Sequence, residues 1–108
     1  MSVMQINNEQ LQVYHADGQK PVLVEYWAPW CVYCRRIAPV MGKIADQYAD
    51  MLVVGQVNID DEPQLASKEQ IEVIPTLVLY QNGQALGSIV APESKAAIDQ
   101  FIQNTLHN

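Results

Sequence analysis

Cysteine is scarce in this chain of 108 residues, which contains only two. Two cysteines cannot form the disulfide framework of a small secreted scaffold, and they cannot fill a four-cysteine zinc site by themselves. Basic residues are also scarce, with six Lys and Arg against twelve Asp and Glu and a formal charge of −6. A nucleic-acid-binding protein needs clustered positive charge for its phosphate contacts, so we expect no nucleic-acid partner.

Long hydrophobic runs are missing too, since no apolar stretch approaches the roughly 20 residues that span a bilayer. The first nine residues have no basic stretch followed by an apolar one, as a signal peptide would. We therefore expect no membrane partner and a cytoplasmic, reducing location. Apolar residues make up 49% of the chain, too many for a disordered protein, and the length predicts a single domain over residues 1–108.

Hydrophobic patterning predicts that strands and helices alternate along the chain. We expect strands at residues 3–6, 21–27, 52–59, 76–80 and 85–90, and helices from Asn7-Asn8 to near Asp17-Gly18, over 34–48, over 64–70 and from Pro92-Glu93 onward. Asn82-Gly83 predicts a type I′ hairpin between the last two strands. Strand–helix–strand crossovers imply parallel pairing, to which the hairpin adds an antiparallel edge, so the fold class is α/β.

Cys31 and Cys34 form a Cys-x-x-Cys pair at the point where a predicted strand leads into a helix. Cys31 would lie at the helix N-terminus, where unpaired N–H groups and the helix dipole favour a thiolate, the reactive form of cysteine. Arg35 and Arg36 add positive charge one turn away, and Cys34 would be shielded for a second step. The pattern favours dithiol–disulfide chemistry.

Two other interpretations of the cysteine pair stay open. The cysteines could be inert core residues, since free cysteine is often simply buried. They could also form half of a metal site, although neither His15 nor His107 has a spacing that indicates ligation.

Five short motifs give the chain a resemblance to the thioredoxin family over nearly its whole length. They follow the order and spacing of that family, and they are Trp27-Ala28-Pro29-Trp30-Cys31, Ile37-Ala38-Pro39, Asn58-Ile59-Asp60, Ile74-Pro75-Thr76 and Asn82-Gly83. The resemblance implies the thioredoxin fold, with a central mixed five-stranded sheet flanked by four helices. Glu25-Tyr26 and Ala28-Pro29-Trp30-Cys31 are closer to protein disulfide isomerase domains, whose strand also carries a buried Glu.

The resemblance implies a thiol–disulfide oxidoreductase with three catalytic residues. Cys31 is the nucleophile that forms a mixed disulfide with the substrate, and Cys34 resolves it. Glu25 is the candidate proton relay for Cys34, because it is the sole acid in an apolar strand and burial should raise its pKa. The alternative for Glu25 is an exposed acid on an edge strand.

The resemblance also implies a substrate-binding rim around the cysteines. Ile74-Pro75 matches the position of a cis peptide bond in this family, and the Ile74 backbone would pair with an extended substrate segment. The expected rim residues are Trp30, Val32, Tyr33, Ile74, Pro75, Val90 and Ala91. We expect Trp27 in the core and Trp30 at the surface.

Three departures from the family pattern affect the reduction potential, the pKa of Glu25 and the substrate-binding rim. Val32-Tyr33 replaces the Gly-Pro of thioredoxin proper, and we expect a reduction potential between roughly −260 and −180 mV, less reducing than thioredoxin. Gln56 replaces the usual Lys, so Glu25 lacks a cationic partner and its pKa should be higher still. Ala91 replaces the usual Gly and adds a methyl group to the rim.

The expected partners are disulfide-containing protein substrates and a thioredoxin reductase-type electron donor, with no cofactor, and we expect the chain to act as a monomer. The acidic run 60–62 is interpreted as a solvated turn, with reductase docking as the alternative. Two functions of other classes stay open: a redox-inert binding module that uses the rim, and a metal or iron–sulfur carrier that uses the cysteine pair.

Overall fold

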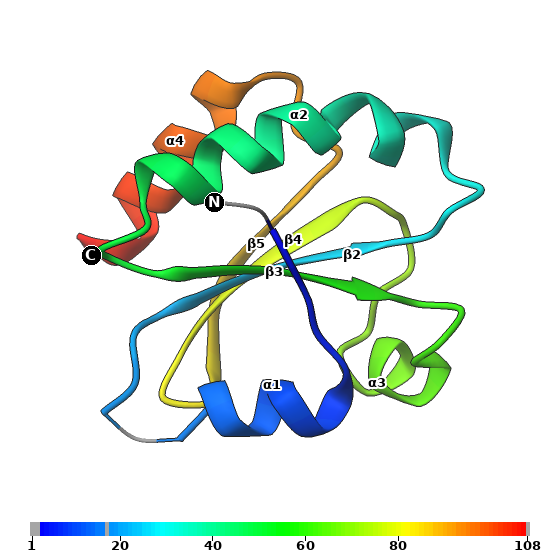
Figure 1. The fold of residues 1–108 in the computed structure, drawn as a ribbon, viewed down its shortest axis with the longest axis horizontal. Coiled ribbons are helices and arrows are strands. Elements are labelled where there is room, and N and C mark those ends of the chain that lie inside the picture. Colours follow the sequence, from blue (N-terminus) through cyan, green and yellow to red (C-terminus); the bar gives the residue numbers. More distant parts are fainter. Residues whose placement is uncertain (1–2, 17, 108) are drawn as a thin grey trace.

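The protein is built around a mixed five-stranded sheet with the strand order β1-β3-β2-β4-β5 (Figure 1). The computed structural model describes residues 3–16 and 18–107. The strands are β1 (Met4–Gln5), β2 (Val22–Trp27), β3 (Val53–Asn58), β4 (Thr76–Gln81) and β5 (Gln84–Val90). Strands β1, β3 and β2 are mutually parallel, whereas β4 is antiparallel to both β2 and β5. The five-stranded mixed sheet predicted from the sequence is confirmed, and β2 lies at its centre.

The pairing of β4 corrects the expectation that each strand–helix–strand crossover makes parallel neighbours. Helix α3 (Pro63–Lys68), which joins β3 to β4, has six residues. Such a helix is about 9 Å long and cannot span a six-residue strand of about 20 Å. The whole connection, residues 59–75, starts after Asn58 and ends before Thr76 at the same end of the sheet, and β4 runs back beside β2.

Helices cover both faces of the sheet. Helices α2 (Val32–Gln47) and α4 (Lys95–Leu106) lie on one face, and α1 (Asn8–Tyr14) and α3 lie on the other (Figure 1). The expected four helices are confirmed. None of the helices in the part of the chain that the structure describes has the length and apolar character needed to cross a membrane.

Helix boundaries differ from the predicted ones where capping residues decide them. Asn7 caps α1 as expected, but this helix ends at Tyr14, before the predicted stop near Asp17-Gly18, of which Asp17 lies outside the described residues. The predicted start of the last helix at Pro92-Glu93 is wrong. Helix α4 begins at Lys95 because the Ser94 hydroxyl accepts the Ala97 N–H at 3.1 Å and so satisfies a free backbone donor.

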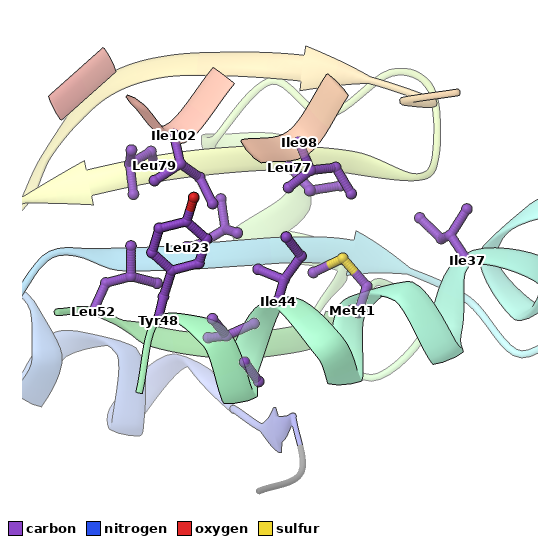
Figure 2. Packing of buried hydrophobic residues seen from close by; sticks show 12 residues of the cluster. Leu23, Ile37, Met41, Ile44, Tyr48, Leu52, Leu77, Leu79, Ile98 and Ile102 are labelled. Carbon is purple, nitrogen blue, oxygen red and sulfur yellow. The ribbon is translucent and has the colours of Figure 1, made fainter. Parts of the chain in front are cut away.

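Two hydrophobic layers hold the helices to the sheet. The layer under α2 and α4 packs Met41 and Ile44 of α2 and Ile98 of α4 against sheet residues such as Leu23 and Leu77 (Figure 2). The opposite layer, under α1 and α3, contains the alternate residues of β2, which are Val22, Val24 and Tyr26. Both faces of β2 are thus covered, which accounts for its nearly continuous apolar sequence.

The β4–β5 hairpin turns at Asn82 and Gly83, as the sequence predicts. Both residues have positive φ values, 52° and 79°. A type I′ turn needs left-handed backbone at both central positions, which Asn and Gly adopt most readily. The hairpin makes β5 the strand at one edge of the sheet.

Candidate active site around Cys31 and Cys34

Cys31 and Cys34 are joined by a disulfide at the start of α2, with their Cα atoms 5.2 Å apart. Cys31 is the N-cap residue of this helix, and its Sγ accepts the Cys34 N–H at 3.2 Å. The same donor and the helix N-terminus would stabilise a Cys31 thiolate once the bond is reduced. Cys31 is 8% exposed and Cys34 is 3% exposed, so Cys34 is the better shielded of the two, as expected. The predicted position at a strand-to-helix junction is confirmed.

The loop before β4 lies directly against the cysteine pair. The Ile74–Pro75 peptide bond is cis, as the resemblance implied. The carbonyl oxygen of Ile74 lies 4.0 Å from Cys31 Sγ, while the Pro75 side chain is buried. The backbone next to the cis bond is therefore within reach of any chain that approaches Cys31.

Glu25 is fully buried in the middle of the sheet, so the interpretation of Glu25 as an edge-exposed acid is wrong. It pairs with Gln56 of β3 and Leu77 of β4. Because side chains alternate along a strand, Glu25 projects to the same side as Leu23, the side that α2 covers. The acid thus lies in the layer under the helix that begins at the cysteines.

A row of three polar side chains connects Glu25 to the edge of the sheet. Gln56 Nε2 donates to Glu25 Oε1 at 2.7 Å, and Gln5 Nε2 donates in turn to Gln56 Oε1. Glu25 Oε2 is buried and has no hydrogen-bond partner among the described residues. Burial raises the pKa of Glu25 to about 7, and the hydrogen bond from Gln56 opposes this rise only in part. None of the three side chains in the row is a cation.

Exposed apolar side chains surround the disulfide on the outside. Trp30 is 63% exposed, Val32 57% and Val90 51%. Val32 lies at the start of α2 beside the cysteines, and Val90 of β5 pairs with Thr76, directly after the Ile74–Pro75 loop, so these predicted rim residues lie at the same end of the sheet. Trp30 is at the surface as expected, whereas Trp27, expected in the core, is only partly buried.

Two hydrogen bonds hold the β5–α4 connection against this rim. Tyr33 donates its hydroxyl to the carbonyl oxygen of Pro92 at 2.7 Å, and the Ala91 N–H donates to the carbonyl of Pro75 at 2.8 Å. Ala91 has a φ of 44°, in the left-handed region that favours glycine. The backbone conformation at position 91 thus favours glycine, a constraint that adds to the effect of the methyl group expected from the sequence.

The sequence did not predict the hydrogen-bond partners of two rim side chains, Trp30 and Tyr33. Asp60 Oδ2 accepts the Trp30 Nε1–H at 3.0 Å, a contact that neither interpretation of the acidic run, a solvated turn or reductase docking, included. Asp60 is exposed and also orients Trp30. Pro92 was expected only as a helix-starting residue. Neither pairing carries a local signal, because the partners are 30 and 59 positions apart in the chain.

The two histidines stand apart from the cysteines in the structure. The ring of His15 packs on Tyr80 with centroids 4.7 Å apart, and His107 contacts Gln103 on α4. Across residues 3–16 and 18–107, no group of three or more His, Cys, Asp or Glu side chains is arranged to hold a metal ion.

Comparison with known proteins connects this geometry to one family. The family model described as Thioredoxin matches residues 2–104. The chain is 42% identical over 90 residues to Thioredoxin 1 of Nostoc sp. (strain PCC 7120), covering 83% of this chain and 84% of the relative. It is 36% identical over 105 residues to the thioredoxin of Acidithiobacillus ferridurans, covering 97% of both chains. It is also 38% identical over 92 residues to the bifunctional thioredoxin reductase/thioredoxin of Mycobacterium leprae, covering 85% of this chain and 20% of that protein.

Proposed function

The chain belongs to the thioredoxin family, and on this premise we propose how its residues divide the work of thiol–disulfide exchange. It is a protein-disulfide oxidoreductase that cycles Cys31 and Cys34 between a disulfide and a dithiol. The observation that carries the proposal is the cysteine pair at the start of α2, with the acid Glu25 buried in the layer below that helix.

In the reductive direction, the Cys31 thiolate attacks one sulfur of a substrate disulfide. A mixed disulfide forms, and the other substrate sulfur leaves as a thiolate. Ionised Glu25 then takes the proton of Cys34, whose thiolate attacks Cys31 Sγ and releases the second substrate sulfur. Two electrons pass to the substrate, and the Cys31–Cys34 bond forms again. Because burial raises the pKa of Glu25 to about 7, this carboxyl group is suited to accept and release a proton near neutral pH.

The rim residues Trp30, Val32, Tyr33, Val90 and Ala91 would bind apolar parts of the substrate. The Ile74 backbone, beside the cis bond to Pro75, would pair with an extended segment that carries the attacked cysteine. The short distance from the Ile74 carbonyl to Cys31 and the exposure of Trp30, Val32 and Val90 support this assignment.

We assign the electrons to a thioredoxin reductase-type donor, because a relative from Mycobacterium leprae bears the name of both activities. The substrates are disulfide-containing proteins, and the chain acts as a single domain over residues 1–108 and as a monomer in a reducing cytoplasm. The reduction potential of the Cys31–Cys34 pair is less reducing than that of thioredoxin. We attribute this difference to Val32-Tyr33 and to the isomerase-like features around Glu25.

Reduction of insulin disulfides by the protein with dithiothreitol tests the assignment. The wild-type protein should accelerate the reaction, Cys31→Ser should abolish the acceleration, and Cys34→Ser should accumulate the mixed disulfide on Cys31. Activity that survives Cys31→Ser would favour a redox-inert binding module. Metal bound in stoichiometric amount after anaerobic purification would favour a metal or iron–sulfur carrier.

A further inference from the structure

The row of Glu25, Gln56 and Gln5 crosses three neighbouring strands at one level of the sheet. Glu25 of β2 pairs with Gln56 of β3, and Gln56 pairs with Gln5 of β1. Gln56 Nε2 donates to Glu25 Oε1 at 2.7 Å, while Gln56 Oε1 accepts from Gln5 Nε2. Both hydrogen bonds thus point their donors toward the acid, which is the direction that an ionised carboxylate requires.

The row leads from the interior of the protein to its surface. Glu25 has no exposed surface, Gln56 is partly buried, and Gln5 is exposed on β1, the strand at one edge of the sheet. Gln5 can therefore rotate in contact with water, whereas Glu25 must find its hydrogen-bond partners inside the protein. A buried polar group that loses its partner destabilises the state in which the loss occurs.

Glu25 must be stable both with and without a proton if it relays the proton of Cys34. A carboxylate only accepts hydrogen bonds, whereas a carboxylic acid also donates one. A lysine beside Glu25 would serve only the ionised form, because an ammonium group has no acceptor. The amide of Gln56 has a donor at one end and an acceptor at the other, so a half-turn presents its Oε1 to the protonated acid.

Gln5 allows this half-turn because it is an amide as well. After the turn, Gln56 Nε2 faces β1 and needs an acceptor, which the Gln5 amide supplies as Oε1 by rotating in the same way. A side chain at position 5 that only donates, or only accepts, matches one of the two orientations of Gln56 and opposes the other.

The elements packed against the row bring few titratable groups to Glu25. Burial raises the pKa of Glu25, and the hydrogen bond from Gln56 lowers it. The other groups to consider are the buried Cys34 of α2 and Tyr48 after it, the Lys95–Asp99 pair of α4, and Asp61 and Glu62, which line a surface hollow beside Gln5. They stay the same in every variant below, so comparisons among the variants isolate the row.

We propose that Gln56 and Gln5 reverse the direction of their hydrogen bonds when Glu25 takes up a proton, so that the buried acid keeps a partner in both of its forms. The inference rests on the relay role of Glu25 in the proposed function. It adds Gln5 to the site as a positioning residue that acts through Gln56.

The test uses side chains at position 5 that fix the direction of the row. Gln5→Lys only donates to Gln56, so it should keep the Gln56 donor toward Glu25 and lower the pKa of Glu25 by about one unit. Gln5→Glu, ionised near neutral pH, only accepts. It should turn Gln56 Oε1 toward Glu25 and raise the pKa of Glu25 by about one unit. NMR titration of the Glu25 carboxyl carbon in the oxidised protein measures both values.

A charge at position 5 also acts on Glu25 through space, and two controls separate this effect. Met4→Lys and Met4→Glu place the same charges on the adjacent residue of β1, which pairs with Gly55 and not with Gln56. They should change the pKa of Glu25 much less, because water and salt screen exposed charges. In a Gln56→Met background, which interrupts the row, the two Gln5 variants should have effects no larger than those of the Met4 variants.

Single-turnover reduction of a peptide disulfide, measured across pH, supplies the functional readout. The midpoint of the step in which Cys34 resolves the mixed disulfide should move with the pKa of Glu25 in both Gln5 variants. Equal pKa values in Gln5→Lys and Gln5→Glu, or a difference that persists in the Gln56→Met background, would overturn the proposed reversal. A shifted pKa with an unmoved midpoint would instead contradict the relay role of Glu25 in the proposed function.

Discussion

Among single residues, Glu25 has the most unusual environment in this protein. It is a carboxyl group with no exposed surface that lies between two strands, and among the described residues its one side-chain hydrogen-bond partner is the amide of Gln56. Burial disfavours the ionised form, which raises the pKa from 4.5 to about 7. The folded state therefore holds the Glu25 proton more tightly than the unfolded chain does, and this has a consequence for stability.

Glu25 should make the oxidised protein less stable as the pH rises. Because the pKa of Glu25 is higher in the folded state, its contribution to the free energy of unfolding is fully present below about pH 4.5. This contribution is lost as the pH rises through about 7. Relative to Glu25→Gln, the wild type should lose on the order of 3 kcal/mol of unfolding free energy across this interval, at about 1.4 kcal/mol per pKa unit. Urea unfolding at a series of pH values measures the difference, with the exposed Glu93 changed to Gln as the control. Parallel pH profiles for wild type and Glu25→Gln would contradict the assignment.

Gln56 should determine how far the pKa of Glu25 rises. In Gln56→Lys an ammonium group would take the place of the amide next to the carboxylate, and we expect the pKa of Glu25 to fall by about 1–3 units. Gln56→Met, which removes the donor without adding charge, should leave the pKa as high or higher. Titration of the Glu25 carboxyl carbon by NMR distinguishes the two variants, and equal pKa values in both would show that Gln56 has no such influence.

Among the elements, the short strand β1 depends on a close approach to β3. Met4 pairs with Gly55, and Ile6, which follows β1, is buried. A Cβ atom at position 55 would overlap the Ile6 side chain and lie 3.3 Å from the Met4 carbonyl oxygen. A larger residue at position 55 must therefore displace the Ile6 side chain, and a substitution there tests how firmly β1 is attached to β3.

Gly55→Ala should destabilise the protein by about 1–3 kcal/mol, because the added methyl group must displace Ile6 and loosen β1. Gly42→Ala is the control, since a Cβ at position 42 of α2 would meet nothing within 4 Å. It should stabilise the protein by about 0.5–1 kcal/mol through the higher helix propensity of alanine. Thermal unfolding of the two variants should thus shift in opposite directions, and a neutral Gly55→Ala would show that β1 adapts freely.

For the whole molecule, the topology assembles the site from separate parts of the chain. The helix that begins after Cys31, the loop containing Pro75 and the end of β5 at Val90 meet at one end of the sheet. The parallel β2–β3 pair ends there, and β4 starts there and runs antiparallel to β2. The direction of electron flow is a property of this assembly, since the stability of both redox states depends on all of its contacts.

The reduction potential should lie between about −260 and −180 mV, above the value near −270 mV that is typical of thioredoxin. The expected cause is the Val32-Tyr33 dipeptide, which replaces Gly-Pro between the cysteines. Equilibration against glutathione buffers gives the value. A double variant with Gly-Pro at positions 32 and 33 should be more reducing than the wild type, and a wild-type potential below that of thioredoxin would contradict the prediction.

Much of this site could be predicted because its signals are local. The Cys-x-x-Cys spacing, the Asn7 cap and the Asn82-Gly83 turn each depend on a few neighbouring residues whose backbone preferences are strong. The burial of Glu25 could also be predicted, because the apolar residues around it indicated a strand covered on both faces.

The rest depends on which distant segments the folded chain brings together. The antiparallel direction of β4, the bond from Trp30 to Asp60 and that from Tyr33 to Pro92 link residues that no local pattern connects. The start of α4 was also mispredicted, since Pro92 and Ser94 are both acceptable helix starts. The chemistry of the cysteine pair thus follows from neighbouring residues and short-range backbone physics. Its surroundings follow from packing across the sheet, where contacts form between residues that are far apart in the chain.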